Sequence, residues 1–168
     1  SLNQNSIGIE ITNPGHGFGY KKFSKKQISS LLKISKLLIK KYNISHKNIL
    51  GHSDISPDRK KDPGEKFPWK YLSKNKIGLW HTLKNQELIK NRKIKTSDID
   101  KETFFDNLFK IGYSKITLES LNKDKYLRNL TKNFQRRFRQ ELINGKIDRE
   151  CLLISINLLK RHNYLNFS

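Results

Sequence analysis

The sequence is that of a small and strongly basic chain. Its 168 residues include 35 Lys and Arg against 15 Asp and Glu, a formal net charge of +20. This charge favours a polyanionic partner, unless the evenly spread lysines only reflect a general bias of composition. A hydrophobic content of 35% excludes an intrinsically disordered chain, because that much apolar surface is enough for a core.

Composition also bears on crosslinks, membrane spans and the ends of the chain. The single cysteine, Cys151, excludes an internal disulfide and, among Leu and Ile neighbours, is predicted to be a small buried hydrophobe. No apolar run approaches the roughly 18 residues of a membrane span, and no signal peptide is visible at the N-terminus. Because the chain contains no methionine, we expect it to be the C-terminal portion of a longer protein.

Residues 6–13 show the alternation of a β-strand. Isoleucines at positions 7, 9 and 11 alternate with Gly8, Glu10 and Thr12, so one face of the strand is predicted to lie in the core. Glu10 then points to the opposite face, beside the space that Gly8 leaves open. On pattern alone, Glu10 is either an exposed carboxylate at a sheet edge or a functional group.

A glycine-rich loop and a helix follow this segment. The loop, residues 14–20, lacks the Lys-Ser/Thr ending of a phosphate loop, and its His16 either lines a pocket or serves as a ligand. Ser24 and Gln27 form a capping box that begins an amphipathic helix ending at Asn43. Residues 48–51 are predicted to be a short buried strand. The order strand, helix, strand predicts a mixed α/β domain with the site at a strand end.

The segment Gly51–Trp69 sets an imidazole, an ammonium and a carboxylate on one short loop, in the side chains of His52, Lys60 and Asp62. Prolines and glycines punctuate it, so a rigid and specially shaped backbone is predicted. Neutral imidazole and carboxylate are both zinc ligands, and a pair separated by a turn can converge on one ion. A surface histidine near a salt-bridged Lys–Asp pair would show the same spacing.

The second half of the chain is predicted to be a linker followed by helices. Residues 82–101 are rich in Lys, Asn, Asp and Ser and are predicted to be the linker. Apolar residues at helical spacing predict helices over residues 102–113 and 124–142. Arg136, Arg137 and Arg139 fall outside the apolar stripe of the second helix and are predicted to lie on a solvated face. They lack the interleaved aromatic platforms of a nucleic-acid surface.

A last helix is predicted to follow the turn at Asn144 and Gly145. Asp148 is in position to cap it, and its apolar residues Leu152, Ile156 and Leu159 are predicted to continue the core. Residues 102–168 would then form a small three-helix module.

These stretches resemble one family along much of the chain. The loop closely resembles the second metal-binding loop of the zinc N-acetylmuramoyl-L-alanine amidases of the AmpD/AmiD type, G-H-S/A-D-I-x-P-x-R-K-x-D-P-G-x-x-F-P-W. Residues 6–13 resemble S-I-G-I-E-x-x-N, the family's strand that carries the catalytic glutamate, and residues 67–80 resemble its ending F-P-W-x-x-L…G-I-G-x-W. In the helical module, F-Q-R-R-F at 134–138 and N-G-K-I-D at 144–148 resemble the peptidoglycan-binding domain.

The resemblance implies a mixed-sheet α/β zinc amidase domain, truncated at its N-terminus, at residues 1–81, and a peptidoglycan-binding domain at residues 102–168. It implies hydrolysis of the amide bond between N-acetylmuramic acid and L-alanine in peptidoglycan or muropeptides. His52 and Asp62 would be zinc ligands, Glu10 the general base, and Lys60 the cation that offsets the charge of the oxyanion.

One family feature has no counterpart in the sequence. The family's first zinc ligand is a His on a strand preceding that of Glu10, and residues 1–9 contain no His. We therefore keep two hypotheses, a zinc amidase and a wall-binding protein without catalysis, while a nucleic-acid binder rests on charge alone and is not favoured. The helical module favours the bacterial cell envelope or periplasm, and the cytoplasm is the alternative, because related amidases without the module recycle muropeptides there.

Overall fold

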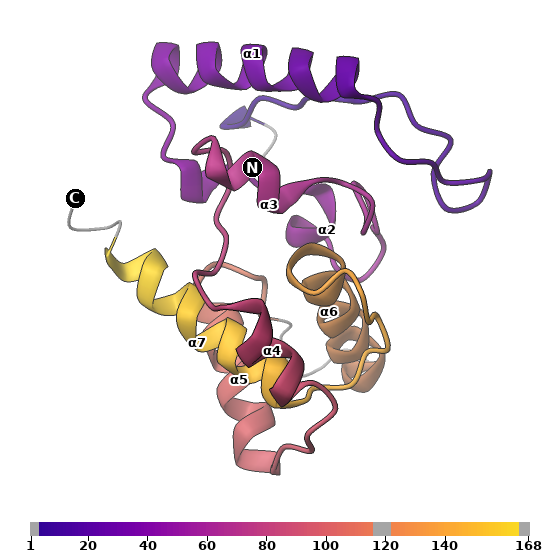
Figure 1. Ribbon diagram of the computed structural model, residues 1–168, viewed down its shortest axis with the longest axis vertical. Helices are drawn as coiled ribbons and strands as arrows, with labels where there is room; N and C mark the ends of the chain where they lie inside the picture. Colours follow the sequence, from indigo (N-terminus) through magenta and orange to yellow (C-terminus); the bar gives the residue numbers. More distant parts are fainter. Residues whose placement is uncertain (1–3, 116–121, 165–168) are drawn as a thin grey trace.

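The computed structural model describes residues 4–115 and 122–164 of the chain (Figure 1). The regular structure of these residues is helical. The elements are α1 (Lys25–Tyr42), the 3₁₀ turn η2 (His46–Asn48), α2 (His52–Ile55), α3 (Trp69–Lys74), α4 (Asn85–Asn91), α5 (Asp98–Lys110), α6 (Lys123–Phe138) and α7 (Arg149–Tyr164). Figure 1 shows α1 at one end of the molecule, α4 to α7 gathered at the other, and the short α2 and α3 between them.

The predicted mixed α/β fold is wrong for the described residues. They contain no strand, and their one β-type pairing is an isolated bridge between Lys95 and Asp148. Residues 6–13 run without regular structure, and Ile7 and Ile9 are 50% and 41% exposed. A strand requires a neighbour for its ladder of hydrogen bonds, and no other described segment pairs with this one. The alternation of isoleucines at positions 7, 9 and 11 therefore does not correspond to a β-strand in this structure.

The second predicted strand is also absent. Residues 48–51 close the 3₁₀ turn and then run extended into α2, without a pairing partner among the described residues. The predicted burial is also wrong for most of this stretch, because Asn48 and Leu50 are exposed, Ile49 is half-buried and only Gly51 is buried. A short apolar run therefore predicted neither a ladder nor burial here.

The predicted helix after Ser24 is confirmed. Gln27 N donates to Ser24 Oγ at 3.2 Å and Ser24 N donates to Gln27 Oε1 at 2.8 Å, which completes the capping box. Asn43 ends α1 in the left-handed conformation, with φ of 50°. The buried face of α1 presents Ile28 and Leu31 to the first of two hydrophobic clusters.

That first cluster lies beneath the loop that carries the candidate site. It consists of Ile28, Leu31, Phe67, Trp69, Leu72 and Ile77. Phe67 and Trp69 pack edge to face with ring centroids 4.9 Å apart, a favoured aromatic geometry. The Phe-Pro-Trp end of the loop is therefore fixed in a core.

The second cluster is the core of the helices α4 to α7, which together with the segments between them are the helical module from here on. Phe104 of α5 and Phe134 of α6 are fully buried, with ring centroids 4.9 Å apart at an interplanar angle of 86°. Cys151 is fully buried, as predicted, and burial raises the pKa of its thiol to about 12. Leu88 of α4, which lies within the predicted linker 82–101, also belongs to this core.

The buried face of α7 differs from the predicted one. Ile154 and Leu158 are fully buried. Of the three predicted residues, half-buried Leu152 packs against the core, whereas Ile156 and Leu159 are half-buried and do not belong to it. Apolar residues fill so many positions of this helix that the pattern did not single out one stripe. The predicted cap is confirmed, because Asp148 Oδ1 accepts a hydrogen bond from Cys151 N at 3.1 Å.

The predicted solvated face of α6 is wrong for two of its three arginines. Arg137 is 4% exposed and Arg139 is 1% exposed. Arg137 forms an ion pair with Asp54, and Arg139 forms ion pairs with Asp148 and Glu150. A buried guanidinium needs a carboxylate partner, and the partner of Arg137 lies 83 positions away in the sequence, where helical spacing gives no signal.

Among residues 4–115 and 122–164, none of the helices combines the length and the hydrophobicity of a membrane-spanning helix.

Candidate active site

The site loop closes on itself at its two ends. α2 begins at His52 directly after Gly51, whose amide donates to Asp54 Oδ2 at 2.7 Å. Ser53 N donates to Asp62 O at 2.9 Å. Only glycine fits at position 51, because a Cβ there would lie 2.7 Å from Cδ of Pro63. These contacts bring the residues next to His52 against the backbone of Asp62.

The structure brings the two predicted metal-binding side chains together. His52 Nδ1 lies 3.0 Å from Asp62 Oδ2, and the side chains are 47% and 60% exposed. Asp62 pairs with His52 and makes no ion pair with Lys60, so the surface Lys–Asp pair that offered the alternative explanation does not form in the described structure. An imidazole and a carboxylate thus converge at an accessible position.

The other two predicted site residues do not contact this pair. Lys60 is half-buried; its amide donates to Ser56 O at 3.0 Å, and its carbonyl accepts from Asn133 of α6 at 2.9 Å. Glu10 is exposed in the extended N-terminal segment. Within the described residues no hydrogen bond or ion pair joins Glu10 or the Lys60 ammonium to His52 or Asp62.

Sequence reasoning missed a second polar cluster at the far end of the loop. His16 Nε2 lies 3.0 Å from Glu65 Oε2, and the His16 ring packs on Tyr20 with centroids 4.3 Å apart. Tyr20 Oη donates to Pro63 O at 2.6 Å and accepts from Lys66 N at 2.9 Å. His16 therefore contacts the loop through Glu65.

Gly64 allows the tight packing of this cluster, and burial shifts the pKa values of Tyr20 and Glu65. Gly64 has φ of +80°, and a Cβ there would lie 2.7 Å from Tyr20 Oη. Burial raises the pKa of Tyr20 to about 12. Burial also acts to raise the pKa of Glu65, but the hydrogen bond from His16 and the charges of His16 and Arg136 outweigh it, so the net pKa lies below its usual value. The Asp-Pro-Gly-Glu string was the available signal, since it marked a tight turn next to a carboxylate.

The donor set fits part of a zinc site. Zinc in catalytic sites takes three protein ligands from His, Cys, Asp and Glu, and keeps a fourth position for water. His52 and Asp62 supply two donors of the right types. Residues 4–115 and 122–164 contain no group of three or more such side chains placed to hold a metal ion. The described residues thus fit two ligand positions and do not supply a third.

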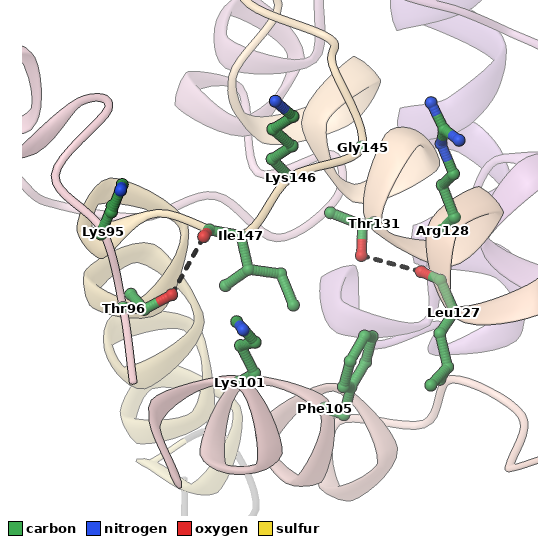
Figure 2. A pocket seen from close by; sticks show the side chains of 10 residues that line it. All are labelled: Lys95, Thr96, Lys101, Phe105, Leu127, Arg128, Thr131, Gly145, Lys146 and Ile147. Carbon is green, nitrogen blue, oxygen red and sulfur yellow. Dashed lines mark hydrogen bonds between the residues drawn. The ribbon is translucent and has the colours of Figure 1, made fainter. Parts of the chain in front are cut away.

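A separate hollow of about 460 Å³ lies in the helical module (Figure 2). Phe105, Leu127 and Ile147 give it an apolar lining, and cationic side chains surround it. These are Lys95, Lys101, Arg128 and Lys146. Thr96 and Thr131 also line it, but their hydroxyls donate to the carbonyls of Ile147 and Leu127 at 3.0 and 2.8 Å. No acidic side chain lines the hollow, but the Lys101 ammonium is already paired with Asp98 at 2.7 Å. The charges of Lys95, Arg128 and Lys146 favour an anionic ligand with an apolar part.

Three comparisons with known proteins agree on a family. Residues 1–65 match the family model of N-acetylmuramoyl-L-alanine amidase. The chain is 32% identical over 166 residues to the N-acetylmuramoyl-L-alanine amidase AmiD of Escherichia coli (strain K12). The aligned region covers 96% of this chain and 59% of AmiD. It is 40% identical over 67 residues to the 1,6-anhydro-N-acetylmuramyl-L-alanine amidase AmpD of Enterobacter cloacae, over 40% of this chain and 34% of that protein.

A solved structure agrees with these sequence matches. It is the complex of E. coli AmiD with the substrate anhydro-N-acetylmuramic acid-L-Ala-D-gamma-Glu-L-Lys. The TM-score is 0.71 at 29% sequence identity, over 86% of this chain and 55% of that one. The chain thus spans well under two thirds of the length of AmiD. The segment matched by the family model contains Glu10, His52, Lys60 and Asp62, and these findings support an amidase of the AmpD/AmiD type.

Proposed function

We propose that this protein is a zinc-dependent N-acetylmuramoyl-L-alanine amidase, which hydrolyses the amide bond between N-acetylmuramic acid and L-alanine in peptidoglycan or muropeptides. The observation that carries the proposal is the convergence of His52 Nδ1 and Asp62 Oδ2, 3.0 Å apart, within a segment matched by the amidase family. The substrate bound in the E. coli AmiD complex, an anhydro-N-acetylmuramic acid peptide, supports this class of substrate.

His52 and Asp62 would hold the zinc ion, with a third ligand supplied from outside the described residues. When bound, zinc lowers the pKa of a coordinated water towards about 7 and polarises a carbonyl. The half-exposed side chains of both residues leave room for a substrate on the solvent side of the loop. The ring nitrogen of His52 that faces Asp62 is Nδ1. Binding of zinc through Nδ1 would replace this hydrogen bond, whereas binding through Nε2 would keep it.

Glu10 and Lys60 are the residues proposed for the hydrolytic step. As water adds to the amide carbonyl carbon, one of its O–H bonds breaks and the Glu10 carboxylate accepts the proton. The Lys60 ammonium offsets the negative charge that develops on the carbonyl oxygen. The C–N bond then breaks, and the proton held by Glu10 passes to the departing L-alanine amine. The products are the free lactyl carboxylate and the peptide.

The test is zinc content and turnover of the chain and four single variants. After dialysis, the unsubstituted chain is expected to retain about one zinc ion and to cleave an N-acetylmuramoyl peptide. His52→Ala and Asp62→Ala are expected to lose the metal, and Glu10→Ala to keep it without turnover. Asp58→Ala is the matched control, because Asp58 is an exposed carboxylate of the same loop. Absence of zinc and turnover in the unsubstituted chain would contradict the proposal.

The lack of a third donor among the described residues favours a second candidate function. The chain would then bind wall fragments without cleaving them, through the basic hollow of Figure 2 in the helical module. Stem peptides carry carboxylates that such a hollow attracts. Under either function we propose the bacterial cell envelope as the location, because that is where intact peptidoglycan lies.

A further inference from the structure

One face of α6 is attached to the site loop. Asn129, Asn133 and Arg137 follow one another at intervals of four residues, which places them on the same side of a helix. Asn129 Nδ2 donates to Asp58 O at 3.3 Å, and Arg137 forms a buried ion pair with Asp54. Just beyond the helix, Gln140 Nε2 donates to Phe67 O at 2.8 Å. The loop is thus held along its length from a module that is distant in sequence.

Asn133 makes the central contact. Its Nδ2 donates to two loop carbonyls, those of Pro57 at 3.1 Å and Lys60 at 2.9 Å. Its Oδ1 accepts from Arg136 Nη1 at 2.8 Å, which fixes the orientation of the amide. Asn133 is 1% exposed, so water cannot replace it as a donor to the two carbonyls. Leaving such buried groups without a partner is costly.

The two carbonyls lie between the candidate ligands along the chain. Pro57 and Lys60 are in the middle of the segment that begins at His52 and ends at Asp62. The two ends of that segment are already joined by the hydrogen bond from Ser53 N to Asp62 O. A loop closed at its ends and held at its middle has few ways to move. The spacing of His52 and Asp62 therefore depends on the contact made by Asn133.

We propose that Asn133 is a positioning residue for the amidase site, acting from the helical module through the backbone of the metal loop. The proposal rests on the proposed function for its metal-binding part, and on the loop contacts alone for its structural part. It assigns α6 a role in the active site that is independent of any binding of cell wall. Partners that orient metal ligands alter metal affinity by about 10- to 100-fold when removed.

The variant Asn133→Ala has a closely matched control in Asn107→Ala. Asn107 is also buried, at 6% exposed, and its Nδ2 donates to Ser155 Oγ at 3.1 Å within the helical core, away from the loop. Both variants remove a buried amide from the same module and lower stability through a lost hydrogen bond. Only Asn133→Ala releases the loop.

Hydrogen exchange of the metal-free full chain is the first measurement. Backbone amides of residues 53–60, apart from Pro57, are expected to exchange on the order of tenfold faster in Asn133→Ala than in Asn107→Ala. Asn129→Ala removes one hydrogen bond to the loop, made by a half-buried side chain. It is expected to speed exchange of the loop by a smaller factor. If Asn133→Ala does not fold, this variant still tests the proposal. Equal exchange of the loop in Asn129→Ala, Asn133→Ala and Asn107→Ala would overturn the proposal.

The second measurement is zinc affinity, determined in competition with a chromophoric chelator. We expect Asn133→Ala to bind zinc about tenfold more weakly and Asn107→Ala to bind it as the unsubstituted chain does. An unchanged affinity in Asn133→Ala would overturn the metal-binding part. If the unsubstituted chain binds no zinc, the proposed function fails, whereas the exchange data still decide whether Asn133 positions the loop.

Discussion

The guanidinium of Arg137 and the carboxylate of Asp54 form an ion pair in which both side chains are 4% exposed. The same carboxylate accepts hydrogen bonds from Gly51 N at 2.7 Å and Tyr113 Oη at 2.8 Å. The guanidinium lies over the ring of Trp69, 4.1 Å from its centroid. One buried pair thus joins the start of the site loop, the core beneath it and the helical module.

Replacing Arg137 by Met is expected to destabilise the fold strongly. The substitution leaves Asp54 buried without its counter-charge, which costs about 3–5 kcal/mol of unfolding free energy. The double variant Arg137→Met/Asp54→Asn is expected to recover part of that loss, because no unpaired charge remains. Denaturant titration followed by circular dichroism measures both values.

The control for Arg137 is an exposed arginine. Arg149→Met, at the start of α7, is expected to change the unfolding free energy by less than about 0.5 kcal/mol, because Arg149 is exposed. If Arg137→Met lowers the unfolding free energy no more than Arg149→Met does, the buried pair of Arg137 and Asp54 makes no net contribution to stability.

Replacing Lys60 by Ala is expected to lower kcat with little change in KM. A cation that acts only on the developing oxyanion stabilises the transition state more than the bound substrate, and removing such a group costs about 100-fold in rate. Steady-state hydrolysis of an N-acetylmuramoyl peptide separates the two constants. Lys61→Ala is the control, since Lys61 is the exposed neighbour on the same loop. If the two substitutions lower kcat equally, Lys60 contributes only through the positive charge of the loop and not through a specific contact with the oxyanion.

The sequence was informative where chemistry and local geometry are encoded within a few residues. The capping box of Ser24 and Gln27, the cap at Asp148 and the pairing of His52 with Asp62 across a turn are all local and were predictable. The sheet was not, because alternating isoleucines fix one face of a strand but not a partner for it. The burial of Arg137 was hidden for a similar reason, since its partner Asp54 lies on another element.

Acid is expected to weaken the fold through His81. Burial, followed by the charge of Lys70, lowers the pKa of His81 to about 4, whereas the ordinary value is about 6.5. Between these values the unfolded chain binds a proton that the folded chain does not, so stability is complete above about pH 6.5 and is lost as the pH falls towards 4. From pH 7 to pH 5 the loss amounts to about 2 kcal/mol.

The variant His81→Phe isolates this contribution. His46 and His162, whose pKa values are also lowered by burial, keep their own pH dependence in the variant. The difference in slope between the two proteins over pH 5 to 7 therefore belongs to His81. Denaturant titrations at each pH measure it, and identical slopes would contradict a neutral buried His81.

Charge reversal at the hollow of the helical module is expected to weaken attachment to the cell wall. Arg128 and Lys146 line the hollow and belong to its cationic rim. The variant Arg128→Glu/Lys146→Glu is expected to reduce the fraction that pellets with purified insoluble peptidoglycan several-fold, because it places carboxylates opposite the carboxylates of the stem peptides. Added salt should weaken binding of the unsubstituted chain in the same assay, because exposed charges are screened.

The double variant Lys123→Glu/Lys125→Glu supplies the control for that experiment. Both lysines are exposed on α6 and neither lines the hollow, so this variant changes the net charge by the same amount at a different place. If only the hollow variant loses binding, the site is local. An equal loss in both would mean that the excess of positive charge, rather than the hollow, attracts the wall, because a diffuse field depends on net charge and not on position.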